Sequence, residues 1–175
     1  STPRTSGSKM LIMKDGTIEG TVGGGLIEAM VIEEAKRLIP LKQSSFKSYH
    51  LDSTLKDSLD MVCGGSLDLL IESIIPEEGV TDLLVEMIRE SEQGRKCLKI
   101  TELPKTDTAT SDIRRCLVKS SREVTGENII PDSLSGDFLS PYTKMNTPTV
   151  TEIGSKRLII EPAFIKGTVY LLGAG

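Results

Sequence analysis

The feature that most constrains the fold is a run of three glycines, Gly23 to Gly25, between a strand-like stretch and a helical pattern. Apolar residues recur at helical spacing from Leu26 to Leu38, and Pro40 marks the end of this helix. On the N-terminal side, the Asp15-Gly16 pair predicts a two-residue turn between two β-prone runs. A hairpin, a glycine loop and a helix are therefore expected in that order.

A glycine loop at the start of a helix is a candidate anion site, because it presents backbone N–H groups to a ligand. No Ser, Thr, Asp or Asn stands directly before Leu26 to cap the helix. We therefore expect its first N–H groups to be open to water or to a phosphate. The alternative is a tight strand-to-helix turn with close packing and no ligand. The sequence leaves both interpretations open.

A second motif with glycines is "DMVCGGSLDLLIE", in which Cys63 precedes Gly64 and Gly65. Unpaired cysteines are mostly buried and inert. Here the glycines can expose the sulfur and bring N–H groups near it, which favours the thiolate. A thiolate is either a nucleophile or a soft ligand for a metal. His50 is the single histidine and lies on an expected strand, so a catalytic Cys–His pair is not favoured.

Composition argues against several classes of function. The net charge is −4 and only 3% of the residues are aromatic, so no surface for nucleic acid is expected. No apolar run approaches the roughly 20 residues of a transmembrane helix. Three cysteines without a close pair fit reduced thiols in the cytoplasm better than a disulfide framework. With one histidine, a zinc site is not expected either.

The rest of the chain predicts further strands, one more helix and one long irregular stretch. Thr81 or Asp82 is expected to cap the second helix, which ends at Gly94. The stretch from Glu123 to Thr149 contains three prolines and little periodicity, which favours a long loop or linker. The expected strands are residues 46–51, a strand starting at 67, 97–101, 115–118, 157–164 and 168–175.

The fold class predicted from these elements is α+β, with a mixed sheet and two helices. The last strand runs into Gly173 and Gly175, the first half of a dinucleotide fingerprint, but no helix or third glycine follows. We therefore expect a Rossmann-like domain that is absent or truncated, and a chain that is a fragment or a processed form. The expected regions are an N-terminal domain over 1–122, a loop or linker with a strand over 123–166, and the start of the Rossmann-like domain over 167–175.

Three stretches in order carry a resemblance to a known family: "STPRTSGSKMLIMKDGTIEGTVGGGLIEAMVIEEA", "DMVCGGSLDLLIE" and "VYLLGAG". Together they resemble the XdhC/CoxI family of maturation factors for molybdenum hydroxylases such as xanthine dehydrogenase and carbon monoxide dehydrogenase. The resemblance covers residues 1–72 and then 169–175. It implies that the N-terminal domain is XdhC/CoxI-like and that a Rossmann-like domain follows it.

The resemblance implies cofactor binding rather than catalysis. Family members bind and protect the molybdenum cofactor (molybdopterin) and help deliver it to the apo-hydroxylase, in some cases after its terminal sulfuration. The cysteine of the family's C-G-G motif matches Cys63, which is thereby implied as a cofactor ligand and a candidate molybdenum ligand. Glycine amides suit the phosphate of the cofactor, and basic residues beside the first motif could add charge-assisted contacts. The candidate cofactor-binding residues are Cys63, Gly64, Gly65, Gly23, Gly24, Gly25 and Arg4, with Lys9 beside Arg4.

The expected partner is an apo molybdenum hydroxylase, and neither nucleic acid nor a membrane is expected. The resemblance leaves open whether a cysteine desulfurase is a further partner, whether the chain forms a homo-oligomer, and whether the missing C-terminal domain binds NAD(P). One alternative is a nicotinamide-dependent oxidoreductase truncated at its dinucleotide-binding domain. Another is a thiol enzyme with Cys63 as its nucleophile. Neither explains why the glycine loop and the Cys-Gly-Gly motif occur together, so we favour the cofactor chaperone.

Overall fold

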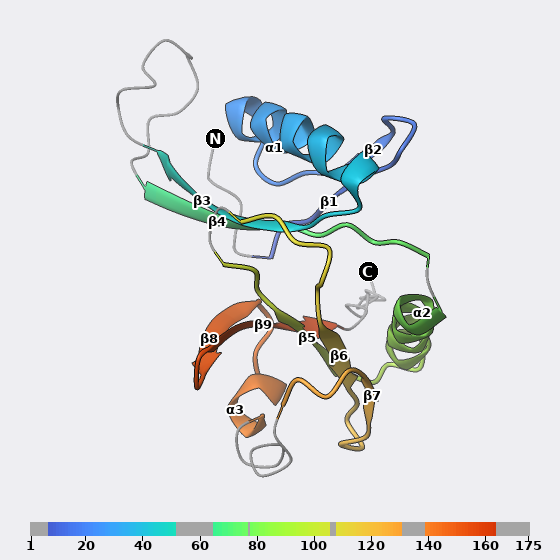
Figure 1. The fold of residues 1–175 in the computed structure, drawn as a ribbon. Coiled ribbons are helices and arrows are strands. Elements are labelled where there is room, and N and C mark those ends of the chain that lie inside the picture. The colour runs from blue at the N-terminus through green and yellow to red at the C-terminus, as the bar shows by residue number, and fades with distance from the viewer. Residues whose placement is uncertain (1–6, 52–64, 77, 106–107, 131–138, 164–175) are drawn as a thin grey trace, which may run out of the picture. The chain divides into compact units, whose positions relative to one another are not determined.

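The structure is a computed structural model, and it describes residues 7–51, 65–76, 78–105, 108–130 and 139–163 (Figure 1). The chain divides into two compact units whose segments alternate along the sequence. Unit 1 comprises Ser1–Ile75, Thr101–Arg114 and Val150–Ile159. Unit 2 comprises Pro76–Ile100, Arg115–Thr149 and Ile160–Gly175.

The hairpin expected at the start of unit 1 is confirmed, but its turn differs from the prediction. Strands β1 (Met10–Ile12) and β2 (Ile18–Gly20) are antiparallel. The Met13 N–H donates to the Thr17 carbonyl at 2.9 Å, so three residues form the loop instead of two. Gly16 closes this loop at φ +90°, where a glycine in the left-handed region accommodates the twist of the strands.

The first helix is where the apolar spacing predicted it. Helix α1 (Gly25–Leu38) is followed by the 3₁₀ turn η1 (Ile39–Leu41), which contains Pro40. Since proline has no N–H to donate, the α-helical pattern stops there. The helix buries one face, as its period of 3.6 residues requires, and the buried residues are Ile27, Val31, Ala35 and Leu38.

A second strand pair completes the N-terminal part of unit 1. Strands β3 (Ser45–Leu51) and β4 (Gly65–Ile71) are antiparallel, with Ser45 opposite Ile71. Both strands were expected from the sequence. The Lys47 ammonium on β3 lies 3.1 Å from the Glu34 carboxylate, which ties this strand to α1.

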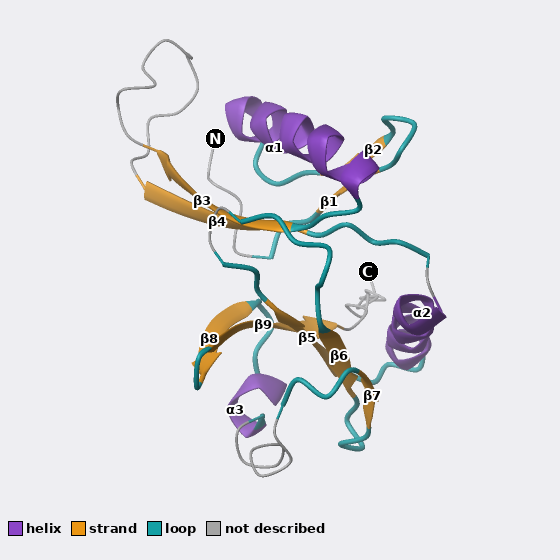
Figure 2. Cartoon of the chain, viewed as in Figure 1, coloured by secondary structure: helices purple, strands orange, loops and turns teal. Residues whose placement is uncertain are grey.

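The remaining strands form a five-stranded sheet with the order β7-β6-β5-β9-β8 (Figure 2). The boundary between the two units falls within β5 and β9, so each of these strands contributes residues to both units. The strands are β5 (Cys97–Glu102), β6 (Arg115–Val118), β7 (Val124–Gly126), β8 (Thr149–Ile153) and β9 (Lys156–Ala163).

In unit 2, helix α2 (Glu78–Glu92) packs Leu83 against Cys97 and Leu117 of the sheet. The expectation of a cap at Thr81 or Asp82 is wrong, because the helix already begins at Glu78 and both residues lie inside it. The end of the helix is as predicted. Gly94 has φ +70°, and the Arg95 N–H donates back to the Glu90 carbonyl at 2.9 Å.

The expectation of a structureless linker from Glu123 to Thr149 is wrong for the part of it that the structure describes. Strand β7 and the short helix α3 (Ser140–Thr143) lie there. The Glu127 N–H donates to the Arg115 carbonyl at 2.9 Å, so backbone pairing continues past β7. Three apolar side chains from this stretch, those of Ile129, Ile130 and Leu139, are buried. Burying these side chains is favourable, and it offsets the conformational entropy that this stretch loses when it becomes ordered.

The α+β class is therefore confirmed, with α1 and α2 as the two expected helices (Figure 2). The C-terminal stretch with Gly173 and Gly175 lies outside the described residues. Within the described ranges, no helix has both the length and the apolar character needed to cross a bilayer.

Candidate functional site

The predicted site residues fall into two groups. Cys63, Gly64 and Arg4 lie outside the described residues. Gly65 is the first residue of β4, where it pairs with Leu51. The glycine loop, Gly23 to Gly25, is fully described and connects β2 to α1. The part of the candidate site that the structure describes is therefore mainly this loop.

The loop has a backbone conformation that requires glycine. Its three residues have φ values of +143°, +82° and +61° in chain order. Side chains with a Cβ atom rarely adopt such values, since the Cβ atom would approach the backbone too closely. A Cβ atom at any of the three would nevertheless meet no other atom within 4 Å. The glycines thus shape the chain and leave the outer side of the loop open to a ligand's close approach.

The Glu28 carboxylate, from the first turn of α1, fills the inner side of the loop. One oxygen, Oε1, accepts hydrogen bonds from the Gly24 N–H at 3.0 Å and the Val22 N–H at 3.2 Å. The same oxygen accepts a hydrogen bond from the Thr21 hydroxyl. The Thr21 oxygen in turn accepts the Gly23 N–H at 3.2 Å. Thr21, Val22 and Gly24 are thereby bound to the Glu28 carboxylate directly, and Gly23 is bound to it through Thr21.

These donors stabilise the ionised form of Glu28. The Thr21 hydroxyl, followed by the loop amides, lowers the pKa of the Glu28 carboxyl from its ordinary value of 4.5 and outweighs the opposing effect of burial. An acid in the first turn is also favoured by the helix dipole. The loop therefore carries its own anion at neutral pH.

This arrangement modifies the expectation of open N–H groups. No side chain caps α1 at its N-cap residue, Gly24, as the sequence suggested. The amides of Val22 and Gly24 are nevertheless occupied. The sequence carries a signal for this contact. An acidic residue four positions after the N-cap acts here as the glutamate of a capping box does from three.

The hairpin holds the base of the loop in place. The Thr21 N–H donates to the Lys9 carbonyl at 3.0 Å, which pairs the end of β2 with the residue before β1. Gly20 has φ +82°, and a Cβ atom there would collide with the same carbonyl. Lys9 therefore contributes to the site through its main chain, whereas its predicted charged contact stays a prediction.

The two described cysteines are not ligand candidates. Cys97 and Cys116 are buried, and burial raises the pKa of each thiol to about 11. Both are therefore protonated at neutral pH and unsuited to bind a soft metal. No group of three or more His, Cys, Asp or Glu side chains that could hold a metal exists among the residues the structure describes.

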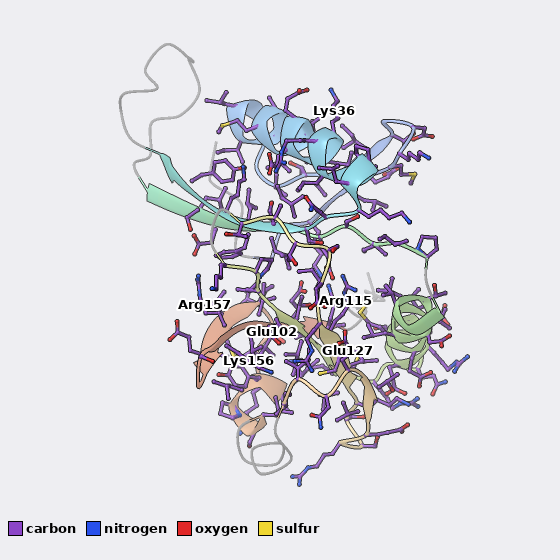
Figure 3. All side chains as sticks on the ribbon, in the orientation of Figure 1. Lys36, Glu102, Arg115, Glu127, Lys156 and Arg157 are labelled. Atoms are coloured by element: carbon purple, nitrogen blue, oxygen red, sulfur yellow. The ribbon has the colours of Figure 1, made fainter. Side chains whose placement is uncertain are left out.

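Three charged side chains elsewhere in unit 1 form ion pairs with one another. The Glu102 carboxylate lies between two cations, 3.4 Å from Arg114 and 3.6 Å from Lys156. The Arg157 guanidinium lies 4.9 Å from the centre of the Phe46 ring, within the range of a cation–π contact. Figure 3 labels Glu102 on β5 and Lys156 and Arg157 on β9.

Unit 2 has buried charges of its own. The Lys99 ammonium lies 3.3 Å from the Glu161 carboxylate, and both residues are buried. Arg115 is also buried, and its backbone N–H donates to a Glu127 carboxylate oxygen at 3.4 Å; Figure 3 labels both residues. Buried charges are normally retained only when they are paired, and the contact between Lys99 and Glu161 supplies that pairing. The glycine loop thus stays the candidate site.

Comparison with known proteins places the loop inside a recognised sequence family. Residues 1–50 match the XdhC and CoxI family, and this segment contains the hairpin, the glycine loop and α1. The chain is also similar to the uncharacterized protein YqeB of Escherichia coli K12, with 31% identity over 115 residues. That match covers 66% of this chain and 20% of YqeB.

A solved structure has a similar fold. The crystal structure of a xanthine dehydrogenase from Bacillus halodurans superposes with a TM-score of 0.66, over 95% of this chain and 46% of that one. At 18% identity this likeness concerns the fold. The chain spans one fifth of YqeB and less than half of the Bacillus halodurans protein. Residues 1–50 therefore match the XdhC and CoxI family, and the chain shares the fold of the Bacillus halodurans protein.

Proposed function

We propose that this protein is an accessory factor that binds the molybdenum cofactor and helps to insert it into a hydroxylase of the xanthine dehydrogenase type. One observation carries the proposal, namely the match of residues 1–50 to the XdhC and CoxI family. The matched segment includes the glycine loop and the helix and strand that follow it, so the loop lies within the matched residues.

The described residues fit such a cofactor at one point. A Cβ atom added at any position from Gly23 to Gly25 would meet nothing within 4 Å, so a flat ligand can approach the backbone there. The remaining proposed contacts are those of the second motif and of the N-terminal arm, Cys63, Gly64, Gly65 and Arg4. When bound, the cofactor would supply the molybdenum centre that the client enzyme needs.

The protein's own residues would hold and release the cofactor. A Cys63 thiolate is a suitable soft ligand for molybdenum, and the buried thiols of Cys97 and Cys116 are not. Delivery requires reversible binding, which one thiolate and a few backbone contacts can provide. The partner that this function requires is an apo molybdenum hydroxylase. We place the protein in the cytoplasm, as its unpaired cysteines suggest.

The test is an anaerobic titration of the chain with molybdenum cofactor released from a hydroxylase. We expect the wild-type protein to bind and Cys63→Ala to bind at least about tenfold more weakly. Cys97→Ala is the matched control, because it removes a thiol that is buried and protonated. Thermal unfolding of each variant shows whether it is folded.

Two results would contradict the proposal in different ways. Equal binding by wild type and Cys63→Ala would remove Cys63 from the site and leave the glycine loop to be tested. An absence of binding by the wild-type chain, in the presence of a positive control protein, would reject cofactor binding by this chain. In a second assay, cofactor-loaded protein should restore activity to an apo-hydroxylase faster than free cofactor does.

A further inference from the structure

The glycine loop differs in one respect from loops that bind phosphate, because a carboxylate of the same chain already accepts the amides of Val22 and Gly24. The Gly24 and Val22 N–H groups donate to Glu28 Oε1 at 3.0 and 3.2 Å, and the Thr21 hydroxyl donates to the same oxygen. We infer that Glu28 is the resident anion of this loop and excludes phosphate from it. Ligands then reach the loop only at its open outer side.

Hydrogen-bond counting supports this exclusion. Each backbone N–H is a single donor, so a phosphate could use the Val22 and Gly24 amides only by displacing Glu28. Displacement would leave an ionised carboxylate next to a phosphate, and like charges so close repel strongly. The contact joins residues close together in the sequence, and Glu28 is held by a helix. Breaking the contact would therefore release little conformational entropy to offset the lost hydrogen bonds.

No cation on α1 compensates for that repulsion. The first turn of the helix carries Glu28, whereas its basic residues, Lys36 and Arg37, are in the last turn. Those two are already paired with Glu33 and Glu34, each at 2.8 Å. The positive end of the helix dipole lies at the loop, and it already stabilises the Glu28 carboxylate.

This inference rests on the loop geometry and narrows the proposed function. The sequence suggested that glycine amides hold the phosphate of the cofactor. With Glu28 in place, the phosphate would have to bind elsewhere, and the loop would contact an uncharged part of the ligand through its backbone. Glu28 is in this sense a specificity-determining residue for the site.

The experiment uses inorganic phosphate as the probe and the ¹⁵N-labelled chain as the receptor. Amide resonances of Val22 and Gly24 are followed by NMR during a phosphate titration at neutral pH and constant ionic strength. We expect no saturable shift in the wild-type protein. In Glu28→Ala we expect saturable shifts at both amides, with an affinity at least about tenfold above that of the wild type. Glu33→Ala changes the net charge equally and should behave as the wild type.

Two results would overturn the inference. One is a saturable phosphate shift at Val22 and Gly24 in the wild-type protein. The other is an absence of binding by Glu28→Ala while its loop resonances show an intact fold. If Glu28→Ala disturbs the loop, Glu28→Gln is used as the test instead, because it keeps an acceptor oxygen and loses the charge. It should bind phosphate more tightly than the wild type, and equal affinity would overturn the inference. Failure of cofactor binding would leave all these results unchanged.

Discussion

Gly126 at the end of β7 lies directly against the main chain of Arg115. A Cβ atom on Gly126 would stand 2.7 Å from the Arg115 carbonyl oxygen, closer than real Cβ contacts come. Gly126 also has φ +100°, in a region that residues with a side chain rarely adopt. Both the backbone angle and the close approach therefore require glycine at this position.

Gly126→Ala should lower the free energy of unfolding by roughly 3 kcal/mol, as the sum of an unfavourable backbone angle and a steric overlap. Gly154→Ala is the matched control, since φ is +59° there but a Cβ atom would meet nothing within 4 Å. The control should lose only about 1 kcal/mol, the backbone part alone. Urea unfolding followed by circular dichroism measures both, and equal losses would contradict the steric explanation.

Leu83→Ala should lower the free energy of unfolding by about 2–5 kcal/mol, because it leaves a cavity under α2. Leu83 is 1% exposed and packs against Cys97 and Leu117. Val85 lies on the same helix but is 46% exposed, so Val85→Ala should change stability by no more than about 0.5 kcal/mol. The same urea experiment compares them. A similar loss in both variants would show that α2 does not pack as described.

Glu28→Gln should destabilise the protein by about 1 kcal/mol at neutral pH, the usual cost of a lost helix cap. The pKa of the Glu28 carboxyl is lowered in the folded protein, first by the Thr21 hydroxyl and then by the loop amides. Its stabilising contribution is therefore complete above the unfolded-state pKa and is lost as the pH falls through the folded-state value. The difference between wild type and Glu28→Gln should shrink as the pH is lowered below about 4.5.

Thermal unfolding of both proteins between acidic and neutral pH tests this dependence. Glu33→Gln serves as the control, since Glu33 is exposed and pairs only with Lys36 in the same helix. Its difference from the wild type should stay small at every pH, as exposed ion pairs contribute little. A constant difference between wild type and Glu28→Gln across the whole range would contradict the prediction.

Alkylation of the native protein at pH 8 should leave Cys97 and Cys116 unmodified. Burial raises the pKa of each thiol to about 11, so about 0.1% of either is thiolate at this pH, and neither is accessible. Mass spectrometry of iodoacetamide-treated peptides should therefore find label at Cys63 alone, or at no cysteine. All three should react in denaturant. Label on Cys97 or Cys116 in the native protein would show that this core opens readily.

Arg122→Gly should raise the free energy of unfolding by roughly 0.5 kcal/mol, the gain at an unfavourable backbone angle minus the entropy cost of glycine. Arg122 has φ +72° in the turn between β6 and β7, where its N–H donates to the Lys119 carbonyl at 2.9 Å. Ser121→Gly, next to it, should lower stability instead. If both variants were destabilised alike, strain at Arg122 would not be the explanation.

The sequence predicted the elements whose signals are local. The apolar spacing from Leu26 to Leu38 predicted α1, and Pro40 marked its end. The hairpin was predicted, but its loop has three residues and not two. The Asp15-Gly16 pair could not distinguish them, because this dipeptide occurs in loops of either length. The loop length is instead set by which residues of the two strands pair, here Met13 with Thr17.

The features that the sequence did not reveal depend on partners distant along the chain or on geometry. The residues after Glu123 looked irregular, yet Glu127 pairs with Arg115, and Ile129 and Ile130 are buried. Threonine is a common N-cap residue, but Thr81 lies inside the helix, which begins at Glu78. In the candidate site, the glycines were predicted and the role of Glu28 was not. Whether a loop amide is free depends on the position of the Glu28 carboxylate, which lies seven residues after Thr21 in the sequence.

The passage of β5 and β9 through both units has a consequence for the synthesis of the protein. Unit 1 receives its first segment from residues before Ile75, yet its last segment ends only at Ile159. Unit 2 likewise needs residues after Ile160. Neither unit can therefore be completed on the ribosome before β9 has emerged, and the earlier segments of both units stay incomplete until then. A chaperone that holds nascent chains would meet its substrate in that interval.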